Sequence, residues 1–354
     1  MSDISQRKAD HLDLAAKGDV GFKGTTTLFE CVRLIHDALP ELSYDEVDTR
    51  CSLLGKALGA PLLIAAMTGG HERAERINCE LAAIAEERKL AFGLGSQRAM
   101  LKDRAKLTSY AVRHVAPTAL ILGNLGVVQA ASMSSAAVED LVGAVGADAL
   151  CVHLNPAMEL VQAEGDRDFR HGLATLTRLS AELSVPVIAK ETGCGLGSRV
   201  ARRLRAAGVR HVDVSGAGGT SWVGVETQRA RDAQKELGQA FWDWGIPTAA
   251  SVGLVAREGF ETIFATGGVK SGLDVVKSIA LGASAGGIAR PMLQALENGG
   301  PAGARAFAAR LEAELRTAML LTGSRDVAAL RRTPRVLLGE LREWLSQEPN
   351  DATP

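Results

Sequence analysis

Small polar residues and one lysine close five of the apolar runs in this chain. They are Thr68, Ser96, Asn124, Lys190 and Ser215. If those runs are neighbouring strands, a ring of hydrogen-bond donors around one lysine suits a planar, polar-edged cofactor that carries a phosphate, and FMN is the obvious candidate. Lys190 could place a positive charge near the flavin N1–C2=O edge and stabilise the anionic reduced form. A lysine at a strand end is otherwise most often a surface residue, so the other four positions must support this hypothesis.

Glycine-rich segments follow the last two apolar runs, at ATGGVKSG (265–272) and GGIARP (286–291). In many barrels the loops after strands seven and eight, with a short helix N-terminus, hold a phosphate. The backbone N–H groups expected to donate are those of Gly267, Gly268 and Ala289. The bland alternative is that these glycines only turn the chain. GCGLGS (193–198) fails the dinucleotide fingerprint because Ser198 replaces its third glycine, and no GxxxxGK[ST] motif occurs.

The fourth apolar run ends in a histidine and an asparagine that share one face. His153 and Asn155 are two residues apart, so both side chains point to the same side of a strand. Glu159 follows on the next turn and could ligate a Mg²⁺ ion that also grips a diphosphate. A lone histidine is usually structural, but the polar neighbour and the nearby acid favour a functional role here.

A basic cluster near the start of the chain could meet the same ligand. Arg7, Lys8 and His11 stand close together in the sequence, and Arg98 follows the second apolar run. Together they could supply charge-assisted hydrogen bonds to a diphosphate lying above the strand ends. Taken alone, the N-terminal cluster is also typical of a solvated charge run.

Eight apolar runs must position these residues. They are LLIAAMTGG (62–70), LAFGLGSQR (90–98), ALILGNLG (119–126), ALCVHLN (149–155), PVIAKETG (186–193), HVDVSGAGG (211–219), IFATGGVKSG (263–272) and AGGIARP (285–291). Each has the composition of a strand buried on both faces, and each is followed by enough residues for a crossover helix. The pattern predicts an α/β fold, a (β/α)8 TIM barrel with N- and C-terminal extensions, whose chemistry sits at the carboxyl ends of the strands.

The barrel is expected to occupy residues 62–291 of a single domain that spans 1–354. Residues 1–60 are expected to form an irregular or helical N-terminal extension that covers part of the barrel. Residues 302–347 are expected to be C-terminal helices, including 335–345 as a separate helix.

One connection is longer than the others. Most successive strand ends are between 22 and 37 residues apart, whereas Ser215 and Gly267 are separated by 52 residues. An insertion after a barrel strand lies over the mouth, so residues 216–250 are predicted to form a wall or lid of the site.

Composition excludes several function classes. Lys plus Arg (40) balance Asp plus Glu (41), so no global charge favours nucleic acid or a membrane surface. The five cysteines are scattered without a CxxC pair, which indicates reduced thiols rather than a zinc site or disulfide framework. The start of the chain lacks the apolar core of a signal peptide, and no run approaches the roughly 18 apolar residues of a membrane span. We therefore expect a cytoplasmic protein.

Motifs distributed along nearly the whole chain resemble those of one flavoenzyme family, the type 2 isopentenyl-diphosphate isomerases. The matching motifs are RKADHL (7–12), MTGG (67–70), GSQRAML (95–101), NLG (124–126), HLNP (153–156), EGDRDF (164–169), KETGCG (190–195), DVSGAGGTSW (213–222), WGIPTAAS (244–251), ATGGVKSGLDV (265–275) and GIARP (287–291). The resemblance implies a homo-oligomeric barrel, a tetramer or octamer, that binds FMN, needs Mg²⁺ and uses NADPH to reduce the flavin. It implies interconversion of isopentenyl and dimethylallyl diphosphate, hence a small prenyl diphosphate as partner.

The resemblance also assigns roles to residues of this chain. FMN would be held by Met67, Thr68, Gly69, Ser96, Asn124, Lys190, Ser215, Thr220, Gly267, Gly268, Lys270, Ile288, Ala289 and Arg290. The substrate would be held by Arg7, Lys8, His11, Ser96, Gln97, Arg98, His153, Asn155 and Met158. Among these, His153, Asn155 and Met158 stand at the catalytic positions, and Glu159 would ligate Mg²⁺.

One of those positions departs from the family pattern. The family has a glutamine directly before the metal-binding glutamate, at the carbon end of the substrate, and this chain has Met158 there. A thioether is a weak acceptor and cannot relay a proton. A smaller departure is Thr192, where the family more often has valine.

Two alternatives to the isomerase therefore stay open. One is an FMN-dependent oxidoreductase acting on a related substrate, although oxidases of similar fold need a histidine base after the sixth strand, and His211 stands at the start of that run. The other is a catalytically impaired paralogue that binds prenyl diphosphates, which only Met158 favours.

Overall fold

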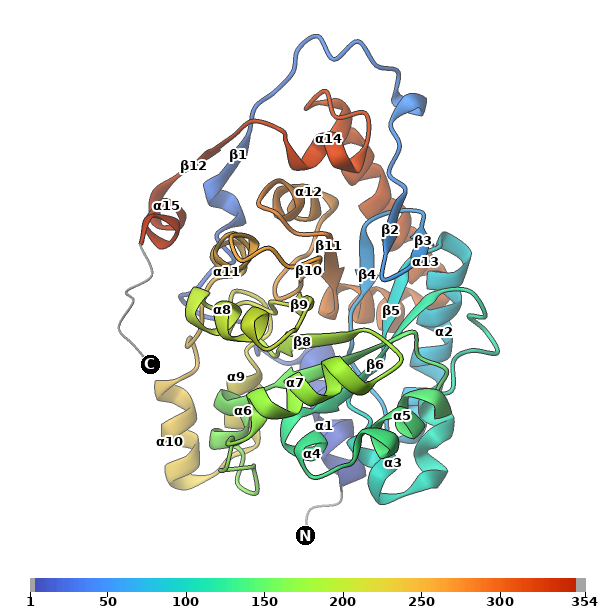
Figure 1. The fold of residues 1–354 in the computed structure, drawn as a ribbon, viewed down its shortest axis with the longest axis vertical. Helices are drawn as coiled ribbons and strands as arrows, with labels where there is room; N and C mark the ends of the chain where they lie inside the picture. Colours follow the sequence, from blue (N-terminus) through green and yellow to red (C-terminus); the bar gives the residue numbers. More distant parts are fainter. Residues whose placement is uncertain (1–3, 348–354) are drawn as a thin grey trace.

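The computed structural model describes residues 4–347, apart from the side chains of residues 4–7 and 9. Eight parallel strands close into a barrel in sequence order (Figure 1). They are β4 (Leu62–Ile64), β5 (Ala91–Gly93), β6 (Leu120–Gly126), β7 (Ala149–Leu154), β8 (Val187–Glu191), β9 (His211–Asp213), β10 (Thr262–Ala265) and β11 (Ala285–Ile288). All eight overlap the predicted runs, so the predicted (β/α)8 barrel is confirmed.

Helices on the outside of the barrel connect these strands. They are α2 (Glu72–Arg88), α3 (Arg98–Lys102), η3 (Arg104–Tyr110), α4 (Val127–Ala131), α5 (Ser135–Ala144), α6 (Pro156–Val161), α7 (Gly172–Glu182), α8 (Ser198–Ala206), α9 (Trp222–Arg229), α10 (Asp232–Ala240), α11 (Thr248–Ala256) and α12 (Gly272–Ala280). Among residues 4–347, no helix has both the length and the apolar composition needed to cross a membrane.

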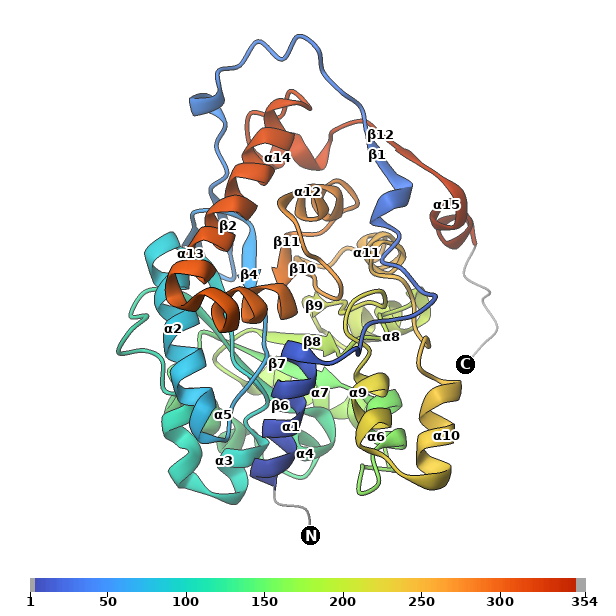
Figure 2. The same cartoon turned by 180° about the vertical axis from the view of Figure 1, so that it is seen from behind.

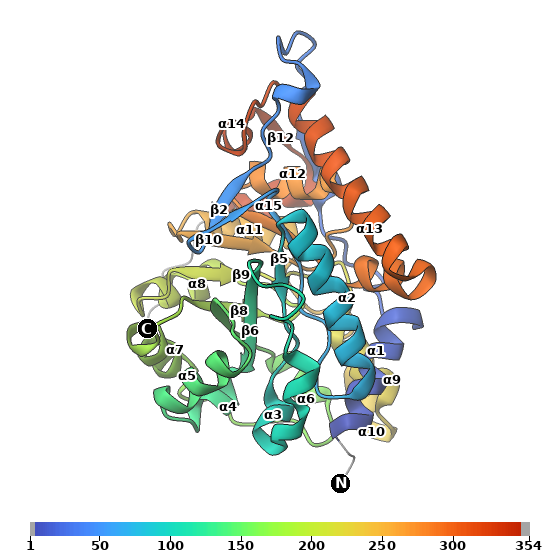
Figure 3. The same cartoon turned by 90° about the vertical axis from the view of Figure 1, so that its right-hand side faces the viewer.

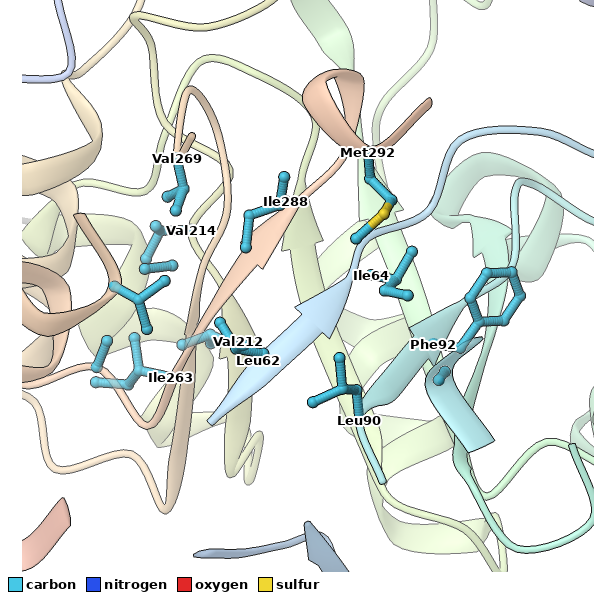
Figure 4. Packing of buried hydrophobic residues seen from close by; sticks show 14 of the residues in the cluster. Leu62, Ile64, Leu90, Phe92, Val212, Val214, Ile263, Val269, Ile288 and Met292 are labelled. Atoms are coloured by element: carbon cyan, nitrogen blue, oxygen red, sulfur yellow. The ribbon is translucent and has the colours of Figure 1, made fainter. Parts of the chain in front are cut away.

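Alternation along the strands divides the core into two layers. Leu62 and Ile64 pack outward against the helices (Figure 4), whereas Leu63 points into the barrel. The interior is filled by side chains from every barrel strand except β9, including Leu120 and Phe264. Burying each large aliphatic side chain contributes about 1.5–3 kcal/mol. The core therefore occupies the interior and leaves the carboxyl ends of the strands available for polar residues.

The N-terminal extension is more regular than expected. It contains α1 (Ile4–Lys17), η1 (Phe29–Cys31), β1 (Val32–Leu34), η2 (Tyr44–Glu46) and a hairpin of β2 (Cys51–Leu53) and β3 (Lys56–Leu58). The hairpin turns at Leu54 and Gly55, which both have positive φ, as a tight two-residue turn requires. Leu53 and Leu58 pack on the inner layer near the strand starts, so the hairpin closes the end of the barrel opposite the predicted site.

The C-terminal extension differs from the prediction in one segment. It comprises α13 (Arg290–Leu320), α14 (Val327–Arg331), β12 (Arg335–Leu337) and α15 (Gly339–Ser346), and α13 lies beside α2 (Figure 3). The helix predicted over 335–345 was wrong at its start, because β12 pairs antiparallel with β1 and a helix begins only at Gly339. The pairing partner lies near the other end of the chain, outside any local sequence pattern.

The insertion after β9 and the N-terminal segment form one wall. Helix α1 lies beside α9 (Figure 2), and the loop that follows α1 is joined to the insertion by hydrogen bonds. Phe22 N–H donates to the Gly219 carbonyl at 3.1 Å, and Ser221 N–H donates to the Val20 carbonyl at 2.8 Å. Asp243 accepts from the Lys23 backbone at 2.6 Å. The wall is therefore built from two segments far apart in the sequence.

Candidate functional site

A cavity of about 610 Å³ lies at the carboxyl ends of the barrel strands. The ends of β4 to β8 and the loops after β9, β10 and β11 line it, as do α1 and residues 22–27. This is the face at which barrel enzymes place their chemistry. The five polar strand ends, Thr68, Ser96, Asn124, Lys190 and Ser215, all line this one cavity.

Glycines bring the loops after β9 and β10 into direct backbone contact at one side of the cavity. A Cβ atom at Gly219 would overlap the backbone nitrogen of Gly268, and one at Gly267 would overlap the Gly216 carbonyl. Gly267 and Gly268 also have φ of +94° and +72°, which side-chain-bearing residues rarely adopt. Close by, α13 begins at Arg290, and Ala289 and Arg290 line the cavity. Exposed backbone N–H groups beside a helix N-terminus form a site suited to a phosphate.

Lys190 faces the cavity from an ion pair buried beneath it. Its Nζ lies 2.6 Å from Asp213 Oδ2 and 3.3 Å from Thr266 Oγ1, and the Thr266 hydroxyl donates to Asp213 Oδ1 at 2.6 Å. Lys190 is 9% exposed and lines the cavity, whereas Asp213 is 2% exposed and lies outside the lining. The positive end of the pair is therefore presented to a ligand, in a position suited to an electron-rich cofactor edge.

Hydrogen bonds fix the tautomer of His153. The Asn124 side-chain nitrogen donates to the Leu94 carbonyl at 3.1 Å, which orients the amide so that its oxygen faces His153 Nδ1 at 2.8 Å. Nδ1 therefore carries the proton and Nε2 does not. Burial and the positive charges of Lys190 and Arg98 lower the pKa of His153 to about 3. His153 is consequently neutral at physiological pH.

A second neutral histidine supports the first strand end. His71 Nε2 lies 2.8 Å from Thr68 Oγ1, and Asn78 donates to the Thr68 carbonyl at 3.2 Å. Burial, followed by the charges of Lys8 and Arg73, lowers the pKa of His71 to about 4. His71 thus holds Thr68 in place as an uncharged partner.

The depressed pKa of His71 makes stability sensitive to pH. Below about pH 6.5 the unfolded chain binds a proton at this residue that the folded protein rejects, so the free energy of unfolding falls as pH drops from 6.5 towards 4. The slope is up to about 1.4 kcal/mol per pH unit. Denaturant unfolding of a His71→Gln variant, which retains a donor for Thr68, is expected to show a smaller decline with falling pH.

The pH dependence of the free energy of unfolding must be compared between wild type and His71→Gln, because Glu191 has the opposite effect on stability. Burial raises the pKa of Glu191 to about 7, which favours the folded state on acidification. Glu191 is present in both proteins, so its contribution cancels. Identical pH slopes for wild type and His71→Gln would contradict the prediction.

The N-terminal helix brings a lysine into the site. Lys8 Nζ donates to the Ser96 carbonyl at 2.8 Å and contacts the Tyr110 hydroxyl at 2.7 Å. Tyr110 is fully buried, and its ring occupies the space that a side chain at Gly69 would need. The MTGG glycine therefore makes room for the group that positions Lys8.

His11 lies on the same helix and makes a different contact. Its Nε2 lies 2.6 Å from Glu226 Oε1, and its ring packs edge-on against Trp222. Glu226 is 2% exposed and also pairs with Arg229 at 2.8 Å. This network joins α1 to α9 at the edge of the cavity.

Glu159 is held in the cavity by two donors. The Asn155 side chain donates to Oε1 at 2.9 Å, and the backbone N–H of Asp166 donates to Oε2 at 2.8 Å. A carboxylate has about four acceptor positions, so two remain. Arg98 Nη1 lies 3.9 Å from Glu159 and 3.6 Å from Asp166. The arrangement places two carboxylates and one guanidinium together, near enough for the guanidinium to act on His153.

Most residues predicted for the site lie in this cavity. They are Lys8, His11, Met67, Thr68, Gly69, Ser96, Arg98, Asn124, His153, Asn155, Met158, Glu159, Lys190, Ser215, Thr220, Gly267, Gly268, Lys270, Ala289 and Arg290. Arg7 lies on α1, but its side chain is outside the described residues.

The structure places two predicted residues elsewhere. Gln97 is fully buried, donates to the Leu141 carbonyl at 3.1 Å and accepts from the Asn124 backbone at 2.9 Å, so it supports Asn124 rather than facing a ligand. The Ile288 side chain packs outward between strand and helices (Figure 4), because alternation turns its neighbours Gly287 and Ala289 into the cavity. The predicted contact of Gln97 with the substrate and that of Ile288 with FMN are therefore not made by these side chains.

Sequence reasoning missed several supporting residues. Asp213, Thr266, Tyr110, His71 and Asp166 each hold a predicted site residue in place. Asp213 could have been predicted from the sequence, because a charged residue within an apolar strand usually needs a partner of opposite charge. Tyr110 and His71 lie in connections whose path the sequence does not reveal.

The fold and this cavity define a class. The chain is a β/α-barrel protein whose strand ends surround a cradle for a phosphate-bearing, flavin-type cofactor. Comparison with known proteins is consistent with that class, since residues 153–336 match the family model described as FMN-dependent dehydrogenase.

More specific relatives cover almost the whole chain. Isopentenyl-diphosphate delta-isomerase of Halobacterium salinarum is 48% identical over 349 residues, covering 96% of each chain. The enzyme of that name from a Synechococcus species is 48% identical over 339 residues, covering 95% of this chain and 97% of the relative. The chain belongs to the isopentenyl-diphosphate delta-isomerase family.

A solved structure of a more distant protein shows the same fold. A mandelate oxidase variant with an FMN adduct superimposes with a TM-score of 0.65 at 21% identity, covering 92% of this chain and 95% of that one. At this identity the likeness establishes the barrel architecture alone.

Proposed function

We propose that this protein interconverts isopentenyl diphosphate and dimethylallyl diphosphate with the help of reduced FMN. The observation that carries the proposal is that one cavity joins two kinds of site in a chain of this family. One side has Lys190 and the glycine cradle, and the other has Lys8, Arg98 and Glu159. A flavin and a diphosphate can thus be held next to each other.

The residues at the flavin side fit FMN. The glycine loops and the start of α13 suit its phosphate, and Lys190 suits the N1–C2=O edge. When bound and reduced, the flavin supplies an N5 edge that can donate and accept a proton. Met67, Phe22 and Trp222 give the cavity an apolar lining, which would help to exclude water from the hydrocarbon end of the substrate.

The opposite side fits a magnesium diphosphate. Mg²⁺ usually binds one or two carboxylates and otherwise takes water and phosphate oxygens, and Glu159 retains acceptor positions for it. Lys8 and Arg98 would donate to the phosphates and fix the alkene in one orientation. Asn155 would then hold Glu159, while His153 would remain a neutral contact.

Anaerobic incubation with isopentenyl diphosphate, FMN, NADPH and Mg²⁺ tests the proposal. We expect dimethylallyl diphosphate to form only when all four are present, and protein that has been freed of unbound FMN to keep a flavin absorbance spectrum. Protein that is colourless once unbound FMN has been removed, or that forms no product, would contradict it. Reduction by NADPH, the tetramer or octamer and the cytoplasmic location are further predictions from the sequence.

The oxidoreductase alternative requires a histidine base after the sixth barrel strand, and His211 does not stand there. His211 lies at the start of β9, where it pairs with Ile188 and Thr262 at the far end of the strand from the cavity. Oxygen uptake with a hydroxy acid would favour that alternative.

Met158 provides a sharper test of the mechanism. It lines the cavity on α6 between Asn155 and Glu159. Because general acid–base groups typically contribute 10²–10⁴-fold, a Met158→Gln substitution is expected to raise turnover by about tenfold or more. Met158→Leu, which keeps an apolar side chain, is the matched control and should leave turnover close to the wild-type value. If Met158→Gln is slower than wild type, methionine is the residue suited to this enzyme.

A further inference from the structure

The loop after α6 returns to Glu159 and carries Asp166, whose backbone supports Glu159 and whose carboxylate has no role so far. Arg167 donates to the Leu160 carbonyl at 2.8 Å, which fastens the EGDRDF loop to the end of the helix. A Cβ atom at Gly165 would overlap the Glu159 carbonyl, so only glycine allows this close return. The loop thereby places Asp166 directly against Glu159.

Asp166 contacts three residues of the diphosphate side. Its backbone N–H donates to Glu159 Oε2 at 2.8 Å, and its carboxylate accepts from Gln129 Nε2 at 2.9 Å. The same carboxylate oxygen lies 3.6 Å from Arg98 Nη1. Gln129 and Arg98 both line the cavity. The carboxylate oxygen of Asp166 that lies near the Arg98 guanidinium is therefore held in place by Gln129. Arg98 lines the cavity, whereas Asp166 lies outside the lining.

The Arg98 guanidinium is attracted by both carboxylates but is hydrogen-bonded to neither. Charge-assisted hydrogen bonds between guanidinium and carboxylate are about 2.7–2.9 Å long. Arg98 Nη1 lies 3.6 Å from Asp166 and 3.9 Å from Glu159, so two carboxylates attract the guanidinium without a direct hydrogen bond to either. A change in the charge on one of them is enough to alter the balance.

We propose that Asp166 is a positioning residue that couples Mg²⁺ to diphosphate binding, an inference that rests on the proposed function. Without the metal, Asp166 and Glu159 together keep the Arg98 guanidinium between their two carboxylates. When Mg²⁺ neutralises Glu159, Asp166 alone cannot hold the guanidinium, and Arg98 turns to the diphosphate. Arg98 therefore contributes fully only when the metal is in place, which favours the metal-bound diphosphate over the free one.

Calorimetric binding of inorganic pyrophosphate to the FMN-loaded protein, with and without Mg²⁺, tests this coupling. Asp166→Asn is expected to tighten metal-free binding and to reduce the enhancement by Mg²⁺ about five- to tenfold. Asp168→Asn is the matched control, because Asp168 lies on the same loop and pairs with exposed Arg170. The control should keep the wild-type enhancement, and Asp166→Glu should recover most of it.

Two outcomes separate this inference from the proposed function. If the wild type binds no pyrophosphate with Mg²⁺, the proposed function fails. The role of Asp166 is overturned if Mg²⁺ enhances pyrophosphate binding equally in the wild type and in Asp166→Asn. That outcome includes a variant whose affinity for pyrophosphate rises by the same factor with and without the metal. Should Asp166→Asn unfold, Arg98→Gln tests the same coupling without altering the loop, and it is expected to lower the enhancement as well.

Discussion

Replacing Lys190 with methionine is expected to weaken FMN binding about ten- to a hundredfold, the loss expected for a hydrogen bond to a charged group. The same change should destabilise the fold by about 3–5 kcal/mol, because it leaves the Asp213 carboxylate buried without its cation. Absorbance titration with FMN and denaturant unfolding measure the two effects separately.

A double variant distinguishes the two roles of Lys190. Lys190→Met combined with Asp213→Asn removes both charges and leaves an amide oxygen for the Thr266 hydroxyl. We expect most of the stability to return while FMN binding stays weak. If the double variant binds FMN as tightly as the wild type, Lys190 serves the fold alone.

A Glu159→Gln substitution is expected to slow isomerisation by at least about a hundredfold and to abolish its dependence on Mg²⁺. A metal ion on a diphosphate is worth several kcal/mol, and each 1.36 kcal/mol corresponds to tenfold in rate. The amide oxygen can still accept from Asn155, although the hydrogen bond from the Asp166 backbone is lost, and the FMN site should remain intact because neither donor belongs to it. Initial rates over a range of Mg²⁺ concentrations provide the measurement.

Glu164→Gln is the matched control for that substitution. Glu164 is exposed and stands on the loop that follows the same helix, so its replacement should leave the rate and the Mg²⁺ dependence unchanged. A Glu159→Gln enzyme that still responds to Mg²⁺ as the wild type does would move the metal to other residues.

The barrel could be predicted because its signal is local. The strands are short apolar runs buried on both faces, and polar residues near or just beyond their carboxyl ends mark the end that carries chemistry. Thr68, Asn124 and Lys190 were found in this way, and they line one cavity. The placement of Ile288 follows from the alternation of side chains along β11, which turns its neighbours Gly287 and Ala289 into the cavity instead. Gln97 lies in the turn before α3, where no alternation rule applies, so its burial against Asn124 was not readable from the sequence.

Other features depend on contacts that no local pattern reveals. The strand β12 forms because β1 supplies its partner, and the position of Lys8 depends on Tyr110, about a hundred residues away. Asp166 belongs to a motif that sequence reasoning noted without assigning a role. Its role depends on the path of a loop that returns to Glu159.

The pairing of β1 with β12 has a consequence for biosynthesis. Val32 pairs with Leu337, so this contact cannot form on a growing polypeptide until Leu337 has left the ribosome. At about 5–20 residues per second, some 300 residues take roughly 15–60 s to translate. The segment just before β1 forms part of the cavity wall, so the pocket should mature only after the barrel has been made, and ligands added during translation should find an unfinished site.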